Sequence, residues 1–293
     1  MSAWIFFTLA AVVFQTARFM LQKQLSANGL SAAGATFARF LWAAPLVWLA
    51  FALQGGSFPV VPPLFWLYAL IGGVTQILAT ICVVAIFKSR NFAVGVTLKK
   101  TEVLLTAFVG LAILGESISA LALAAILAGL AGVLLLTDLP GGKGLKRFAN
   151  RAAVLGVTSG LFFALSGVTI RGATLLVPAE PATRALLTLL IVVTSQVLLL
   201  GAWLALAERG EITRVVLGWR RTIWVGLTSV AGSYCWFAGF TLQNAALVYA
   251  VGQFEVVLSL LASVLFFRER ISAKEFGGIA LITASVLGLI ILG

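Results

Sequence analysis

Two matching stretches decide the fold: NFAVGVTLKKTEVLLTAFVGLAILGESIS at residues 91–119 and NAALVYAVGQFEVVLSLLASVLFFRERIS at residues 244–272. They align without a gap at a shift of 153 residues. The shift superimposes Cys82 on Cys235, Asn91 on Asn244, Glu102 on Glu255, Glu116 on Glu269 and Ser119 on Ser272. Composition alone explains shared Leu, Ala and Val, but not coincident glutamates and an asparagine. The chain therefore contains an internal repeat.

The composition is that of a membrane protein. Hydrophobic residues make up 61% of the 293 positions and charged residues 10%, whereas about a quarter of a soluble domain is charged. A bilayer-spanning helix needs about 20 mainly apolar residues, so ten such helices would occupy nearly the whole chain. The net charge of +11 comes mostly from short loops between apolar runs. That pattern orients a membrane protein, and no nucleic-acid partner is expected.

The lengths of the apolar segments, and the Gly, Pro and charged residues that separate them, predict ten transmembrane helices. We expect them at about 4–22, 32–53, 64–87, 92–115, 119–137, 153–176, 182–206, 221–242, 245–267 and 274–292. The chain divides into a first repeat (1–140), a basic linker (141–151) and a second repeat (152–293). Because each repeat has an odd number of helices, the second enters the membrane in the opposite sense. The predicted fold is an all-α polytopic membrane protein of two inverted five-helix repeats, as in many secondary transporters.

Most basic residues fall in the loops that follow the odd-numbered helices. These loops contain Lys23, Lys88, Arg90, Lys143, Lys146, Arg147, Arg151, Arg209, Arg214, Arg220, Arg221, Arg268, Arg270 and Lys274. Only Arg171 and Arg184 fall near the other side. The positive-inside rule assigns the basic side to the cytoplasm. We therefore expect a multi-pass protein with both termini on the outer side of the membrane.

The first matching stretch places charges deep in an apolar run. Lys99 and Lys100 lie roughly 12–14 Å along their predicted helix, close to the middle of a hydrocarbon core about 30 Å thick. A charged side chain at this depth has a high free-energy cost and usually faces a cavity or a partner. Lys99 and Glu102 share a helix face and can neutralise each other. Lys100 can pair with Glu255 from the second repeat.

Three interpretations of these charges stay open. In the first, the two lysines bind a substrate carboxylate and a glutamate binds its ammonium group, which suits amino acids. In the second, the charges form an ion-pair lock between the fourth and ninth helices in one conformation. In the third, one lysine extends to the membrane surface because its helix begins later than expected.

Other polar and aromatic side chains are weaker candidates for the same cavity. Gln15, Arg18 and Gln22 form a polar stripe on the first helix, and Arg18 is either a second anion site or a residue near the cytoplasmic interface. For Arg39 and Arg184, near helix starts, an anchor at the helix end is an equally good interpretation. The remaining candidates are Gln76, Thr80, Tyr234, Trp236, Tyr249 and Gln253. Rings at 236 and 249 are deep enough to stack on an aromatic substrate.

Two pairs of repeat-related residues are expected at helix ends. Asn91 and Asn244 are expected to cap helix starts. Glu116 and Glu269 fall in turns, where we expect them to cap or to pair locally.

Three segments resemble a known family. The segment FARFLWAAPLVWLAFAL (37–53) resembles the second-helix signature of EamA-type carriers of the drug/metabolite transporter superfamily. TEVLLTAFVGLAILGESIS (101–119) and FEVVLSLLASVLFFRERIS (254–272) resemble that family's fourth and ninth helices. Family members often have Glu-Pro in these helices, whereas Val103 and Val256 follow the glutamates here, which puts a proline kink in doubt.

The resemblance implies a ten-helix, two-repeat carrier of small metabolites or drugs, often moved outward. Helices 1, 3, 4, 6, 8 and 9 would surround a central cavity. Among bacterial members the chain looks most like the YddG-type exporters of aromatic amino acids. This resemblance implies a bacterial inner membrane, with both termini in the periplasm.

The sequence thus predicts a secondary carrier that exports small metabolites, amino acids including aromatic ones, by alternating access between the two repeats. The alternative is a proton-coupled exporter of cationic or lipophilic drugs with Glu102 or Glu255 as the counter-charge. The chain lacks HExxH, GxSxG and paired-Asp motifs, so no enzyme is expected. We expect no cofactor, and as partners an amino-acid-like substrate and the lipid bilayer. Two repeats in one chain make a monomer sufficient, although a dimer is compatible with them.

Overall fold

The computed structural model describes residues 2–88, 92–136, 150–258 and 273–292, and every regular element in these ranges is a helix. Six of the described helices are long and apolar enough to span a membrane. They are α1 (Ala3–Ala27), α2 (Ala32–Leu53), α3 (Pro63–Phe87), α7 (Arg151–Leu175), α8 (Pro181–Ala207) and α10 (Trp219–Leu242). The others are α4 (Phe92–Lys99), α5 (Glu102–Leu114), α6 (Ala120–Leu136), α9 (Glu211–Leu217), α11 (Ala245–Gly252) and α13 (Ala273–Leu292). The all-helical fold class is confirmed.

The helix boundaries agree with the sequence prediction to within two residues, except that α1 continues to Ala27 instead of ending near residue 22, and except in three further places. The predicted helix 92–115 is divided into α4 and α5, and the ninth helix is interrupted after α11. The short helix α9, which precedes α10, was not expected. Residues 141–149 of the linker and the end of the ninth helix lie outside the described residues.

The two interruptions lie at equivalent positions of the repeats. Lys100 and Thr101 form a turn between α4 and α5, and Gln253 forms a turn directly after α11. A shift of 153 residues superimposes Lys100 on Gln253. Both turns are closed by backbone hydrogen bonds to the third residue back, 3.0 Å from Lys100 N to Thr97 O and 3.2 Å from Gln253 N to Ala250 O. A tightened turn thus interrupts each helix, although valine and not proline follows Glu102 and Glu255.

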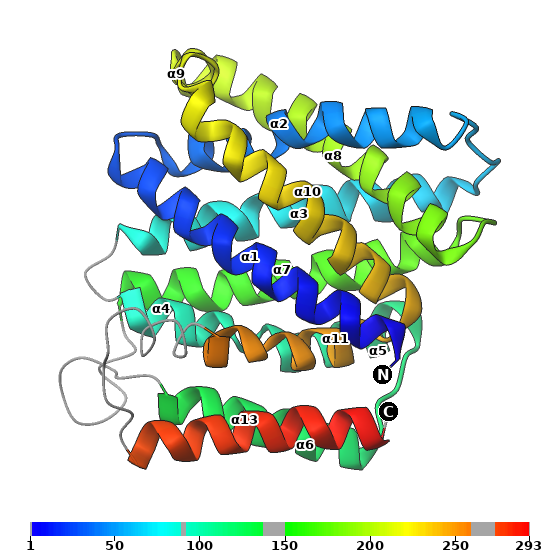
Figure 1. The fold of residues 1–293 in the computed structure, drawn as a ribbon, viewed down its shortest axis with the longest axis vertical. Coiled ribbons are helices and arrows are strands. Elements are labelled where there is room, and N and C mark those ends of the chain that lie inside the picture. Colours follow the sequence, from blue (N-terminus) through cyan, green and yellow to red (C-terminus); the bar gives the residue numbers. More distant parts are fainter. Residues whose placement is uncertain (1, 89–91, 137–149, 259–272, 293) are drawn as a thin grey trace.

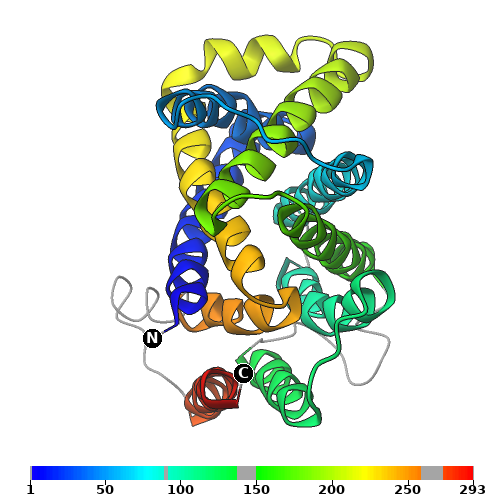
Figure 2. The same cartoon turned by 90° about the vertical axis from the view of Figure 1, so that its right-hand side faces the viewer.

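The helix contacts are exchanged between the two halves. α3 packs along α7, and α1 packs along α10. Because the shift relates α1 to α7 and α3 to α10, these are the same contact seen from each repeat. Figure 2 shows the α1/α10 pair on one side of the molecule and the α3/α7 pair on the other. α6 and α13, which also correspond, pack together at the lower end of Figure 1.

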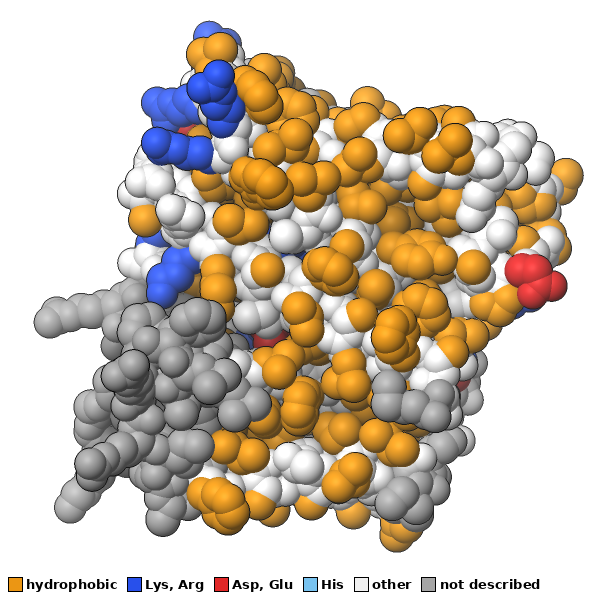
Figure 3. All heavy atoms as spheres, viewed as in Figure 1, with side chains coloured by type: hydrophobic (Ala, Val, Ile, Leu, Met, Phe, Trp, Pro, Cys, Tyr) orange, Lys and Arg blue, Asp and Glu red, His pale blue; other side chains and the backbone are white. Residues whose placement is uncertain are grey.

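The two ends of the helices differ in charge. The start of α1 and the end of α13 lie at the right-hand end in Figure 1. Figure 3 shows that most of the visible Lys and Arg side chains gather at the opposite, left-hand end, while hydrophobic side chains cover the area between. We call the left-hand end the basic end and the right-hand end the terminal end.

Glycines allow two helix pairs to approach closely. A Cβ atom added to Gly156 of α7 would lie 2.3 Å from the carbonyl oxygen of Gly95 in α4. A Cβ atom on Gly226 of α10 would lie 2.3 Å from Cβ of Trp42 in α2. Small residues of this kind let helix backbones pack in a membrane, where no hydrophobic force drives helices together.

Candidate functional site

Both ion pairs expected from the sequence are present. Lys99 Nζ lies 3.2 Å from Glu102 Oε1, and Lys100 Nζ lies 2.6 Å from Glu255 Oε2. The two lysines are 4% and 3% exposed. Neither therefore extends to the membrane surface, and the third interpretation of these charges is wrong. The turn at Lys100 lets adjacent lysines reach acids on different helices, although consecutive residues of one helix point about 100° apart.

Glu255 and Gln15 connect this charge cluster to α1 and α10. Glu255 Oε2 accepts a hydrogen bond from Gln15 Nε2 at 3.3 Å in addition to that from Lys100. Gln15 Oε1 accepts from Trp236 Nε1 at 3.1 Å and from Arg18 Nη2 at 3.4 Å. Arg18 is only 1% exposed. Arg18 therefore belongs to the buried network. Of its two expected positions, the one near the cytoplasmic interface is wrong.

Arg39 is a buried cation, although the sequence analysis considered it equally well an anchor at a helix end. Its Nε donates to Ser229 Oγ at 2.9 Å, its Nη1 to Thr80 Oγ1 at 3.0 Å and its Nη2 to Ser233 Oγ at 3.1 Å. The anchoring interpretation therefore fails for Arg39. A usable signal was present, since Arg39 stands eight residues beyond the Ser31 cap, about 12 Å into α2 at 1.5 Å per residue.

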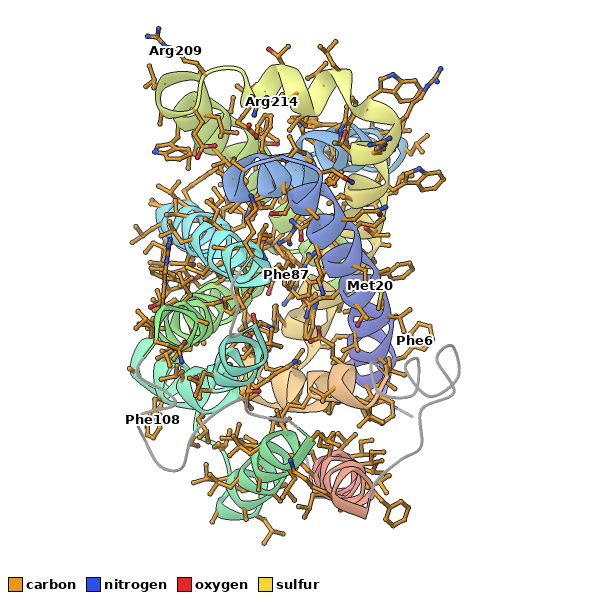
Figure 4. The ribbon with its side chains drawn as sticks, turned by 90° about the vertical axis from the view of Figure 1, so that its left-hand side faces the viewer. Phe6, Met20, Phe87, Phe108, Arg209 and Arg214 are labelled. Carbon is orange, nitrogen blue, oxygen red and sulfur yellow. The ribbon has the colours of Figure 1, made fainter. Side chains whose placement is uncertain are left out.

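A cavity of about 240 Å³ opens beside the ion pairs at the basic end. It is lined by Thr16, Phe19, Met20 and Lys23 of α1, by Val83, Ile86 and Phe87 of α3, by Val96 and Lys99 of α4, and by Lys100 and Glu255. Figure 4 looks onto this end and shows Met20 and Phe87 across from each other. Lys99 Nζ lies 4.9 Å from the ring centroid of Phe163 and 5.7 Å from that of Phe19. The cavity thus combines buried cations, one carboxylate and aromatic faces.

The aromatic candidates pack against one another. Ring centroids of Trp236 and Phe240 are 5.7 Å apart, and Tyr249 lies 5.3 Å from the first and 5.2 Å from the second. The Tyr249 hydroxyl donates to the carbonyl of Phe163 at 3.1 Å. These rings pack behind the hydrogen-bonded network through the contact of Trp236 with Gln15, and they do not line the cavity in this conformation.

Three other candidates lie outside the cluster. Gln76 accepts a hydrogen bond from Gln196 Nε2 of α8 at 2.9 Å. Tyr234 packs edge-on against Phe7, with centroids 6.3 Å apart. Gln253 is 1% exposed, and neither polar atom of its amide has a hydrogen-bond partner in the described part of the chain.

Two helix-end expectations hold. Asn244 accepts a hydrogen bond from Ala246 N at 2.9 Å and so caps α11, as expected. Arg184 is an anchor at the start of α8, because its Nε donates to the carbonyl of Ala179 at 2.6 Å. Asn91 and Glu269, the other repeat-related residues expected at helix ends, lie outside the described residues.

Arg171 joins several elements at the terminal end. Its Nε pairs with Glu116 after α5, and its Nη1 donates to the carbonyls of Phe240 at 2.6 Å and Gln243 at 2.7 Å. The expected local partner of Glu116 is thus wrong, because Arg171 is 55 positions away. The sequence held a signal for Arg171, because the 153-residue shift superimposes Arg18 on it.

The sequence profile of the EamA-like transporter family matches residues 2–138 and 150–291, once in each half. The chain belongs to the EamA-like transporter family. This confirms the resemblance of the helix signatures. A solved structure titled "Crystal structure of protein" aligns with 100% of this EamA-like transporter and 98% of its own chain, with a TM-score of 0.74 and 17% identity. Such a likeness shows the fold alone. A comparison with curated proteins finds no match.

Proposed function

We propose that this EamA-like transporter is a secondary carrier of a bacterial inner membrane. It exports small metabolites that carry a carboxylate, amino acids including aromatic ones, by alternating access between its repeats. One observation carries the proposal: a cavity lined by Lys99, Lys100 and Glu255 lies at the basic end. We further propose that the contacts of Arg171 with Glu116, Phe240 and Gln243 hold the terminal end closed. A substrate carboxylate can take the lysines from their glutamates, and a freed carboxylate can then bind an ammonium group.

The proposal includes ten spans in two inverted five-helix repeats. We count α4 with α5, and α11 with the residues after it, as one interrupted span each. The equivalent interruptions and the exchanged helix contacts support this count. We place the basic end in the cytoplasm and the terminal end in the periplasm, because Lys and Arg are concentrated on the cytoplasmic side of membrane proteins.

Proton-coupled export of cationic drugs is the weaker alternative. It requires a carboxylate that attracts the drug. Glu102 and Glu255, the candidates named for this role, are both already paired with lysines. A cationic substrate would also meet repulsion from those lysines.

Counterflow into proteoliposomes tests the proposed function. Vesicles preloaded with an unlabelled solute should accumulate the labelled form when the solute is Trp, Phe or Thr, and vesicles without protein provide the baseline. Accumulation of a lipophilic cation, with none of the three amino acids, would overturn amino-acid export in favour of the drug exporter.

Replacement of Arg171 by glutamine should open the terminal end. The change removes the cation that binds Glu116, so the closed arrangement loses a charge-assisted contact. In a background without native cysteines, a cysteine at Val168, buried one turn deeper on α7, should react at least about five-fold faster with an impermeant thiol reagent on intact cells. A cysteine at exposed Ser2 should react at one rate in both backgrounds. Protection of Ser2→Cys from the reagent would show that the proposed membrane orientation is reversed. An unchanged rate for Val168→Cys would show that Arg171 does not hold the terminal end closed.

A further inference from the structure

Among the side chains that the structure describes, the buried cations of the charge network outnumber its carboxylates. Lys99 and Lys100 are matched by Glu102 and Glu255. Arg18 and Arg39 add two more buried cations, 1% and 2% exposed. The carboxylates with described side chains are Glu102, Glu116, Glu180, Glu208, Glu211 and Glu255. None of these forms an ion pair within 4.0 Å of either guanidinium.

The two arginines share one face of α10. Ser229 and Ser233, which accept hydrogen bonds from Arg39, stand one turn apart. Trp236 stands on the next turn and is joined to Arg18 through Gln15. The partners of Arg39 are neutral hydroxyls, so they satisfy its N–H groups without cancelling its charge.

Arg18 has a buried edge, unsatisfied by the described residues, that matches a carboxylate. Its Nε has no hydrogen-bond partner in the described ranges, and its Nη2 has only the 3.4 Å contact with Gln15. Nε and an Nη group side by side are the fork that binds a carboxylate through two parallel hydrogen bonds. The guanidinium carbon lies 4.8 Å from the centroid of Phe19, a ring that lines the cavity and that Lys99 also approaches.

We propose that the substrate supplies the missing negative charge. The carrier selects small organic anions, such as acidic amino acids and dicarboxylates, over neutral analogues of the same shape. Arg18 binds the additional anionic group, and Arg39 is a positioning residue whose fixed charge acts on Arg18 and so favours an anion beside it. A buried charge without a counter-charge is costly in a membrane, so an anion that enters this region recovers interaction energy that a neutral solute cannot. The inference rests on the proposed transport function and narrows its substrate class.

Acid and amide pairs test this proposal, because replacing a carboxylate by a carboxamide removes the charge and nearly keeps the size. The pairs are glutamate with glutamine and succinate with succinamate. Their binding to the purified full chain is measured by thermal stabilisation in detergent, and their transport by inhibition of counterflow in proteoliposomes. We expect each acid to act at a concentration about ten-fold or more below that of its amide, the ratio that one charge-assisted hydrogen bond provides.

Variants assign the selectivity to the two arginines. Arg18→Gln and Arg39→Gln should bring the acid-to-amide ratio toward one, whereas Arg39→Lys, which keeps the charge, should retain a preference for the acid. Arg184→Gln is the matched control, since Arg184 anchors α8 away from this region, and it should leave the ratio unchanged. If Arg39→Gln does not fold, Arg18→Gln and Arg39→Lys still decide the roles.

Each outcome separates this inference from the transport function. Equal action of acids and amides, with counterflow of Trp, Phe or Thr intact, would overturn anion selectivity and leave the carrier function standing. A preference for acids that survives in both glutamine variants would overturn the roles of Arg18 and Arg39. Absence of counterflow with every solute would overturn the transport function and this inference together.

Discussion

Replacement of Lys100 by methionine is expected to abolish counterflow and to lower stability strongly. The change removes the cation 2.6 Å from Glu255, and breaking one side of a buried ion pair costs about 3–5 kcal/mol. Thermal unfolding in detergent measures the loss of stability, and counterflow measures transport. Arg209→Met removes an exposed cation in the turn between α8 and α9 and should change neither quantity.

The double variant Lys100→Met/Glu255→Gln separates the two remaining interpretations of the charges. Removal of both charges avoids an uncompensated carboxylate, so much of the stability should return. If the lysine binds substrate, the double variant stays inactive although it is folded. Recovery of transport together with stability would show that the pair is an ion-pair lock without a part in substrate binding. Full activity of the single variant would contradict both interpretations.

Replacement of Gly156 by leucine is expected to separate α7 from α4. The first carbon of the new side chain would lie 2.3 Å from the Gly95 carbonyl, and that neighbour is backbone, which cannot rotate away. Overpacking typically costs about 1–3 kcal/mol, and more where the backbone must move. Because α4 ends at Lys99, its displacement would also disturb the charge cluster. Transport should be lost, with a lower unfolding temperature and a lower yield of monodisperse protein.

Gly277→Leu provides the matched control. No heavy atom of the described residues lies within 4 Å of a Cβ placed on Gly277, so the same increase in volume should leave stability near that of the parent chain. If both variants unfolded at the same temperature, the close approach of α7 to α4 would not limit stability.

Features encoded by periodicity and by the repeat were predictable from the sequence. Apolar length located the six long described helices, and the duplicated glutamates marked Glu102 and Glu255 as equivalent residues. The depth of Lys99 and Lys100 in an apolar run was sufficient to predict both ion pairs, because charges at that depth need partners. These inferences depend on spacing along the chain, which the sequence gives directly.

Features that depend on contacts between distant elements were not predictable. The turn at Lys100 has no proline or glycine to mark it, and it depends on contacts that the chain makes after folding. Arg39 appeared to be near a helix end, yet three hydroxyls from α3 and α10 hold it in the interior. Glu116 was expected to pair locally because it falls in a turn. Its partner, Arg171, instead stands on another helix, which spacing along the chain does not reveal.

Arg18 and Arg171 occupy equivalent positions of the two repeats but have unequal surroundings. The guanidinium of Arg171 has three oxygen acceptors, while that of Arg18 has one long contact. The difference between the ends of the molecule therefore resides partly in contacts that do not line the cavity. Substitutions at the terminal end can shift the balance between conformations without altering the groups around the solute. Resting conformation and solute preference could thus diverge independently as such a chain evolves.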